Sequence, residues 1–126
     1  MTAPKFTPGP WVAHQSTRYR GPIGHAWDIA TGEATWDPRD YDRDEGTMGT
    51  WNYPDDYSRI ATTSDVGSGN NAQANAHLIA AAPDLYAALD ELVAVEDEAS
   101  AGRHDLPRLY RAIEHARAAI GKAVPS

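Results

Sequence analysis

The chain has no cysteine among its 126 residues. Without thiols it cannot be a secreted module stabilised by disulfide bonds, bind zinc through thiolates or use a cysteine nucleophile. Basic residues are also scarce, because 11 Lys and Arg stand against 18 Asp and Glu, a net charge of −7. This charge balance disfavours direct binding of nucleic acid through a basic surface.

Long apolar runs are missing as well. No run approaches the roughly 20 residues that a membrane span requires, and the Pro-rich N-terminus lacks the basic start and apolar centre of a signal peptide. The length corresponds to one domain, since domains commonly have about 100–150 residues. The sequence therefore predicts a single soluble domain over residues 1–126 that acts in a cytoplasm and contacts no membrane.

The negative charge is concentrated between Asp37 and Asp56, where seven acids face two arginines for a net charge of −5. Two prolines and two glycines interrupt this stretch, which predicts a long acidic loop over 37–56. Mobile acidic chain ordinarily has few aromatics, yet several occur in and beside this segment. They either form a contact surface or fold back onto the protein's own core. They are Trp36, Tyr41, Trp51, Tyr53 and Tyr57.

Composition changes near Ser68, from short β-prone runs bounded by Gly and Pro to a stretch rich in alanine and leucine. This division predicts an α+β fold, with a β-rich part over 1–66 and a helical part over 70–123. The β part holds a small antiparallel sheet of three to four short strands, with Trp11, Trp27, Ile29 and Ile60 inward. The expected strands are 10–15, 25–31, 33–36 and 57–63, with a turn at Thr31-Gly32 that pairs the second and third.

Three helices are expected, over 72–82, 84–99 and 106–122, with Asn70 or Asn71 as the first cap. Pro83 predicts a break or kink between the first two helices. The last two helices are expected to form an antiparallel hairpin, and the helical part as a whole is expected to cover the sheet. Either the sheet or a second copy of the chain then covers the hairpin itself. Their apolar stripes are expected to pack on each other: Leu85, Leu89, Leu92 and Val93 against Leu106, Leu109, Ile113, Ala116 and Ile120.

Two segments resemble a set of small, mostly uncharacterised accessory proteins of tailed phages and prophages. They are TPGPW (Thr7–Trp11) and NAHLIAAAPDLYAALDELV (Asn75–Val93). In that set a GPW start precedes a few short strands, and an NAxLIAAAPxLLxAL segment leads into C-terminal helices. Tyr86 occupies a position where the set usually has a second leucine. Residues 16–69 do not resemble the set. The resemblance implies a phage protein in the host cytoplasm, and both segments are expected to be architectural.

Motifs for catalysis or metal binding are incomplete. Asp40, Asp42 and Asp44 have the opening spacing of a calcium loop, but Glu45 and Trp51 occupy the positions where glycine and glutamate are required. The five histidines show no zinc-protease spacing, and no serine has a G-x-S-x-G context. We therefore expect no catalytic residues, no metal, no cofactor and no enzymatic activity. The histidines are His14, His25, His77, His104 and His115.

Two functional hypotheses follow. In the first, a non-enzymatic phage protein binds a host protein of the defence machinery through the acidic aromatic segment, because Trp and Tyr dominate interface centres and acids favour a basic partner. The residues expected to bind this partner are Asp40, Tyr41, Asp42, Asp44, Glu45, Trp51 and Tyr53.

In the second hypothesis, an oligomeric protein sequesters a nucleotide immune signal. Arginines beside aromatic rings hold phosphates and bases, and the Gly67–Asn71 turn before a helix can present N–H groups to an anion. The residues expected to bind this ligand are Arg18, Tyr19, Arg20, Arg59, Asn70 and Asn71. The alanine-rich helices are also candidates for homo-oligomer formation.

Overall fold

A computed structural model describes residues 5–18, 26–42, 46–64 and 71–125. Five strands in two small antiparallel sheets precede three helices within that part of the chain, which confirms the α+β class. The strands are β1 (Val12–Gln15), β2 (Ala26–Ala30), β3 (Thr35–Asp42), β4 (Thr47–Asn52) and β5 (Arg59–Ser64). The helices are α1 (Ala72–Ala80), α2 (Ala82–Ser100) and α3 (Leu106–Ala123).

The larger sheet has the order β1-β2-β5, so the central strand β2 pairs with β1 on one edge and with β5 on the other. The expected hairpin across Thr31-Gly32 is therefore wrong, because both edges of β2 are already occupied. The chain instead leaves the sheet after β2, forms the separate β3–β4 pair, and returns as β5.

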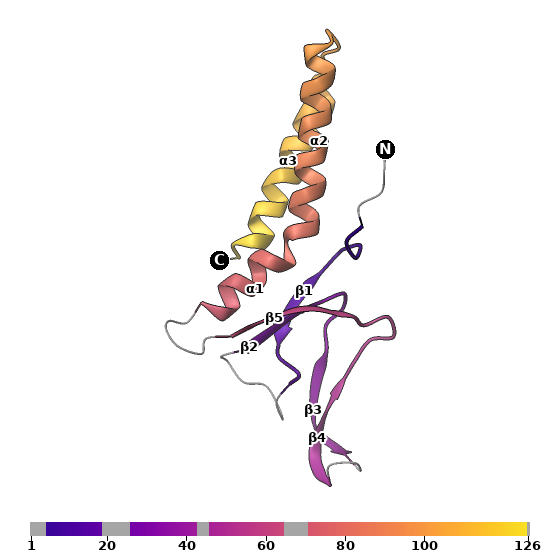
Figure 1. Ribbon diagram of the computed structural model, residues 1–126, viewed down its shortest axis with the longest axis vertical. Helices are drawn as coiled ribbons and strands as arrows, with labels where there is room; N and C mark the ends of the chain where they lie inside the picture. Colours follow the sequence, from indigo (N-terminus) through magenta and orange to yellow (C-terminus); the bar gives the residue numbers. More distant parts are fainter. Residues whose placement is uncertain (1–4, 19–25, 43–45, 65–70, 126) are drawn as a thin grey trace.

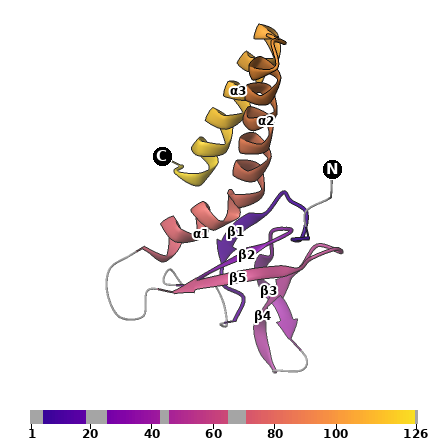
Figure 2. The same cartoon turned by 45° about the horizontal axis from the view of Figure 1, so that its top comes forward.

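Helix α1 lies across one face of the larger sheet (Figure 2). Its buried residues Ala72, Ala76 and Ala80 recur at every fourth position and therefore line one side of the helix. The small methyl groups bring the helix close to Trp11 and Ile29, which share a core cluster with Ala76 and Ala80. The four residues that were expected to point inward all belong to this cluster or pack against it.

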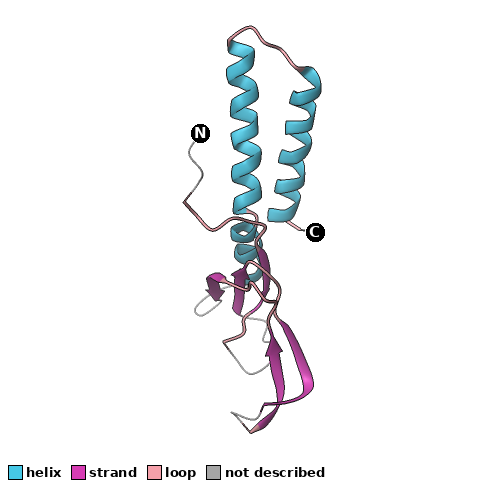
Figure 3. Ribbon diagram, turned by 90° about the vertical axis from the view of Figure 1, so that its right-hand side faces the viewer, coloured by secondary structure: helices cyan, strands magenta, loops and turns pink. Residues whose placement is uncertain are grey.

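Helices α2 and α3 form the expected antiparallel hairpin, and the helical part covers the sheet through α1 rather than through this hairpin. Only α1 contacts the strands, and the α2–α3 hairpin extends away from them (Figures 1 and 3). Pro83 lies in the first turn of α2, which explains why the chain bends there without losing the helix. Asn71 precedes α1 without a side-chain capping bond, whereas Asp105 caps α3 by accepting from the Arg108 N–H.

The expected packing of the two leucine-rich stripes on each other is also wrong. The buried residues of α2 and α3 are mainly alanines, whereas Leu89, Val93, Leu106 and Ile120 are more than half exposed. Small residues allow the two helices to approach closely, so the larger side chains are displaced to the outside of the hairpin. None of the described helices is long and apolar enough to cross a membrane.

The segment expected to be a long loop over 37–56 is largely a β-hairpin, formed by β3 and β4. It projects from the sheet at the end opposite the helical hairpin (Figure 3). Its acids and prolines suggested a loop, but Trp, Tyr and Thr residues favour paired strands, and Trp36 pairs directly with Trp51. An irregularity between Asp37 and Tyr41 accommodates Pro38, which cannot donate to a strand ladder.

Candidate functional site

The face of the larger sheet that α1 leaves open carries a row of polar side chains. His14, Asp28 and Thr62 are register partners on β1, β2 and β5, so their side chains lie next to one another. Asp28 is fully buried although it lies on this face. A buried carboxylate requires partners, and the residues around it supply them.

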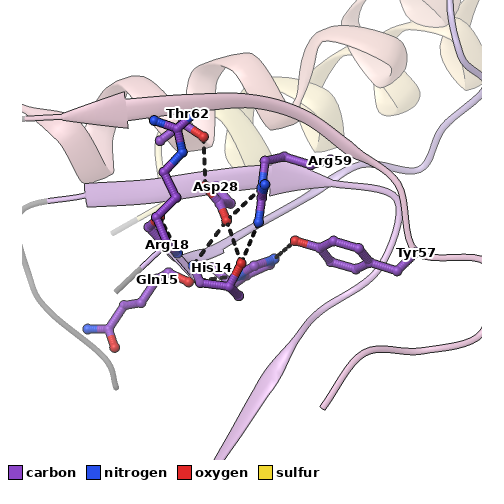
Figure 4. A network of polar contacts seen from close by, with 9 residues as sticks. His14, Gln15, Arg18, Asp28, Tyr57, Arg59 and Thr62 are labelled. Carbon is purple, nitrogen blue, oxygen red and sulfur yellow. Dashed lines mark hydrogen bonds and ion pairs between the residues drawn. The ribbon is translucent and has the colours of Figure 1, made fainter. Parts of the chain in front are cut away.

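Four hydrogen bonds surround the Asp28 carboxylate (Figure 4). Its Oδ2 accepts from the Thr17 N–H at 3.1 Å, from the Thr17 hydroxyl at 3.3 Å and from the Arg59 Nε at 3.1 Å. Its Oδ1 accepts from the Thr62 hydroxyl at 2.7 Å. Burial alone would raise the pKa of Asp28, but the bonds from Thr62 and Thr17 and the charge of Arg59 outweigh it and lower the pKa.

Arg59 and Tyr57 extend this network toward the surface. Arg59 also donates to the Thr17 hydroxyl at 2.5 Å, and the Asp28 carboxylate raises the pKa of the guanidinium despite its partial burial. The Tyr57 hydroxyl lies 3.0 Å from His14 Nε2, and His14 Nδ1 lies 2.8 Å from the Gln15 carbonyl. Because a carbonyl only accepts, His14 Nδ1 donates to the Gln15 carbonyl, and Nε2 is the ring nitrogen that bonds with the Tyr57 hydroxyl. Burial and the nearby Asp28 charge raise the pKa of Tyr57.

This network holds the chain where it leaves and rejoins the sheet, and Thr31 adds a second clamp there. The Thr31 hydroxyl donates to the Asp56 carbonyl at 2.9 Å and accepts from the Ser58 N–H at 2.9 Å. The Tyr57 ring packs against the Tyr53 ring with centroids 4.8 Å apart. Because the acceptors and donors satisfy one another, the network is suited to fixing the base of the β-hairpin rather than to reacting with a substrate.

The β-hairpin Thr35–Asn52, called the arm below, carries a tryptophan pair on one face. The Trp36 and Trp51 rings meet edge-to-face with centroids 5.3 Å apart. Gly49 lies beneath the Trp36 ring at φ +102°, and a Cβ there would stand 2.2 Å from Trp36 Cζ2. Glycine is required at this position both by the backbone conformation and by the close approach of the indole.

Three acids of the arm, Asp37, Asp40 and Asp42, belong to strand β3. Asp37 accepts from the Arg39 N–H at 2.9 Å, and Asp40 accepts from the Thr50 hydroxyl at 3.0 Å. The backbones of Tyr41 and Asp42 belong to β3, and their side chains lie outside the described atoms. Of the other residues expected to bind a partner, Trp51 and Tyr53 lie on or beside β4, and Asp44 and Glu45 lie outside the described residues.

A hollow of about 360 Å³ opens where the arm meets strand β1. Trp27, Trp36 and Trp51 line it together with Glu33 and His14. The Trp27 Nε1 is buried without a hydrogen-bond partner among the described residues. The sequence did not indicate that Glu33 or Asp28 belongs to this region, although an aspartate in the middle of an otherwise apolar strand was a usable signal for Asp28.

The residues expected to bind a nucleotide are not brought into one pocket by the part of the chain that the structure describes. Arg59 is the first residue of β5, whereas Asn71 precedes α1, beyond the opposite end of that strand. Arg18 lies beside the Asp28 network (Figure 4), and its backbone N–H donates to the Ser16 hydroxyl at 3.2 Å. Tyr19, Arg20 and Asn70 lie outside the described residues.

The described histidines lie apart from one another. His14 belongs to the Asp28 network. The His77 ring packs beside the Trp27 ring with centroids 5.8 Å apart, and His115 Nδ1 lies 2.8 Å from Glu91 Oε2. His25 is outside the described residues. Among the residues that the structure describes, no three His, Asp or Glu side chains gather as a set of metal ligands.

Residues 1–125 match the family described as Salmonella phage P22 protein Y8K6. The match spans almost the whole chain, so the chain belongs to this family, which supports its interpretation as a phage accessory protein. No curated protein and no solved structure matches it.

Proposed function

We propose that this member of the phage P22 Y8K6 family is a non-enzymatic binding protein that contacts a basic surface of a host protein through its arm. The observation that carries the proposal is the Trp36–Trp51 pair, presented on an acidic hairpin that projects from the sheet. Apart from the hollow at its base, where it meets β1, the arm has no backbone contact with another helix or strand in the described part of the chain.

The chemistry of the arm suits a protein interface. Tryptophan and tyrosine are enriched among the residues that dominate binding energy, because they bury a large rigid area at low entropic cost. Trp36 is held over Gly49 and paired with Trp51, so its orientation is set before binding. A surface ordered in advance loses less entropy when a partner docks.

The charge of the arm indicates the sign of the partner surface. Residues 35–52 contain five acids and two arginines, a net charge of 2 − 5 = −3. A dense group of acids attracts a basic surface, raises the association rate and repels nucleic acid itself. Host defence proteins that handle nucleic acid carry such basic surfaces, so we name them as the partner class.

The test uses the tagged full-length protein to capture host proteins, which are then identified by mass spectrometry and measured for affinity at low and high salt. We expect capture of a basic protein whose affinity falls as salt rises, and loss of that capture in Trp51→Ala. A triple variant of the arm should weaken binding at low salt and flatten its salt dependence. The arm substitutions are Asp42→Asn, Asp44→Asn and Glu45→Gln.

A matched control neutralises three exposed acids of the helical hairpin, so that the net charge changes equally. If this control weakens binding as much as the arm variant does, net charge rather than the arm explains the interaction. Unchanged affinity in both the arm triple variant and Trp51→Ala would refute the proposal. The control substitutions are Asp90→Asn, Asp97→Asn and Glu114→Gln.

A thermal-shift screen against cyclic and ADP-ribose-type nucleotides separates this function from sequestration of a nucleotide signal. We expect no stabilisation, because Arg59 already donates to Asp28 and Thr17 and a bound phosphate would have to displace these acceptors. Stabilisation that disappears in Arg18→Ala would favour the nucleotide hypothesis instead.

A further inference from the structure

The α2–α3 hairpin has two unlike faces. One face carries three ion pairs that recur at every seventh residue on both helices. An interval of seven residues is close to two helical turns, so the pairs form one row along one flank of the hairpin. They are Asp84–Lys122 at 2.7 Å, Glu91–His115 at 2.8 Å and Glu98–Arg108.

Small side chains fill the seam between the two helices. Ala88 and Val95 of α2 are buried, as are Ala112 and Ala119 of α3. These residues again stand seven apart, in the same register as the ion pairs. The seam therefore consists largely of alanines, and the larger apolar side chains have no place within the hairpin.

The larger apolar side chains gather on the flank opposite the ion pairs. Successive residues of an α-helix are rotated by about 100° around the helix axis. On α2, Leu85, Leu89 and Val93 lie 60–140° around this axis from Ala88, on the side away from Glu91. On α3, Ile113 and Ile120 lie 80–100° from Ala112 in the direction away from His115. Because the ion pairs fix one common flank for both helices, the apolar residues share the other. We call this surface the apolar face, formed by Leu85, Leu89, Leu92, Val93, Leu106, Leu109, Ile113 and Ile120.

The apolar face has no cover in the described part of the chain. Leu89 is 62% exposed and Val93 57% exposed on α2, and Leu106 is 56% exposed and Ile120 57% exposed on α3. The hairpin extends away from both sheets, so no strand shields it (Figures 1 and 3). Soluble proteins rarely leave contiguous apolar surface of this kind in contact with water.

We infer that a second copy of this chain packs on the apolar face, so that two hairpins form an antiparallel four-helix bundle. Each helix has the two adjacent apolar seams that such a bundle requires, one for its hairpin partner and one for the second copy. Helices of 18 and 19 residues are about 27 Å long, and two of them present a face roughly 20 Å wide.

The area of this face is sufficient for a specific dimer. Its projected area is on the order of 500 Å² per copy, and protruding side chains add to that figure. Two copies together thus bury more than roughly 1,000 Å², the lower bound for a specific interface. The face carries few charges. By the same rotation Glu96 lies on it, about 80° from Ala88 near the C-terminal end of α2, and Arg117 lies at its edge, about 140° from Ala112. The remaining positions are apolar, which suits the core of a homodimer interface.

The charges of α2 and α3 indicate which helix of the second copy each one contacts. Residues 82–100 of α2 contain six acids and neither lysine nor arginine. Residues 106–123 of α3 contain four Lys and Arg and one acid. Some of these charges already pair within the hairpin on the opposite flank. The charges that remain are three acids on α2 (Asp90, Glu96 and Asp97) and a net charge of 2 − 1 = +1 on α3 (Arg111, Arg117 and Glu114). A two-fold axis along the hairpin places each acidic α2 against the basic α3 of the other copy, whereas an axis across it places α2 against α2. The first arrangement pairs opposite charges and avoids like-charge repulsion.

The mass of the full-length protein in solution tests this inference. We expect twice 13.7 kDa by light scattering or sedimentation at up to about 100 μM, and 13.7 kDa for the double variant Leu89→Gln/Ile120→Gln. Both side chains are exposed within one copy, so the variant should keep its helical circular dichroism. The control Ala118→Gln, on the flank with the ion pairs, should remain dimeric. A monomeric wild type, or a folded double variant that stays dimeric, would overturn the inference.

The absence of cysteine allows the pairing itself to be tested by cross-linking. Leu85 and Ile120 lie at nearly the same height, because Asp84 faces Lys122 within the hairpin. Mixing the single variants Leu85→Cys and Ile120→Cys should therefore give a disulfide between two copies under mild oxidation, since such bonds need Cα atoms within about 7 Å. Disulfides between two copies that both carry Leu92→Cys, in place of the mixed one, would overturn the pairing of α2 with α3.

Discussion

The Asp28 network provides the most direct test of how the base of the arm is held. Replacing Asp28 by alanine removes the acceptor of two Thr17 bonds, one Arg59 bond and one Thr62 bond. Breaking a buried ion pair by removing one partner costs about 3–5 kcal/mol. The Arg59 side chain is 37% exposed and regains some hydration, so we expect the lower end of that range.

Asparagine at position 28 separates the charge of the carboxylate from its hydrogen bonds. The amide oxygen of Asp28→Asn can still accept from Thr17 and Arg59, and its NH₂ can donate to the rotated Thr62 hydroxyl. We therefore expect a loss of only about 1–2 kcal/mol for asparagine against about 3 kcal/mol for alanine. For a chain of this length, about 3 kcal/mol corresponds to a fall in Tm of roughly 10–15 °C.

The two variants are measured by urea unfolding, followed by tryptophan fluorescence and circular dichroism. The pKa of Asp28 in the folded protein lies below its ordinary value of 3.8, so the carboxylate stabilises the fold above that pH. This stabilisation is lost as the pH falls through the folded pKa. The stability difference between wild type and Asp28→Asn should therefore stay constant above about pH 5 and shrink as the pH falls through 3.8 and below.

Two results would refute this reasoning. A loss below about 1 kcal/mol in Asp28→Ala would mean that the network adds little to stability. A difference between wild type and Asp28→Asn that stays constant across the acid range would mean that the charge of the carboxylate is not what stabilises the fold. Thr62→Val provides a second test, because it removes the hydroxyl bond that helps to lower the pKa of Asp28. It should cost about 1 kcal/mol at neutral pH, and this cost should decrease as the pH falls and Asp28 becomes protonated.

Three further substitutions test other parts of the structure. Gly49→Ala places a methyl group against the Trp36 ring at a positive φ, so we expect a change in near-ultraviolet circular dichroism and a loss of more than about 1 kcal/mol, and an unchanged spectrum would contradict the packing. Tyr57→Phe removes the bond to His14 and should cost about 1 kcal/mol in urea unfolding, with no loss if that bond is absent in solution. Asp105→Ala removes the cap of α3 and should cost about 1 kcal/mol, whereas Asp105→Asn should retain most of the stability.

The sequence predicted the helical part well because its signals are local. Helical periodicity, the position of Pro83 and the start of the last helix at Leu106 follow from residues a few positions apart. The strands Val12–Gln15, Ala26–Ala30 and Arg59–Ser64 were also found within a few residues. Which strands pair could not be read in the same way, because pairing depends on contacts between residues far apart in the chain.

The acidic segment shows how composition misled the prediction. Aspartates and prolines between Asp37 and Asp56 indicated a loop, but the cross-strand pair of Trp36 and Trp51 favours a hairpin. The aromatics of this segment were recognised from the sequence, whereas their arrangement over Gly49 was not. The Asp28 network likewise combines residues from three strands and a loop, which no short motif records.

The sequence by itself determined the α+β class, the order of β-rich and helical parts, the three helices, and the concentration of acids and aromatics in one segment. Each of these follows from composition or from spacing along the chain. The tertiary structure decided that α1 alone covers the sheet and that the acidic segment projects as an arm. It also decided that alanines form the seam of the hairpin while leucines and isoleucines face outward. The physical reason is that an amphipathic stripe records which residues avoid water, whereas the element that covers them depends on close packing with residues distant in sequence.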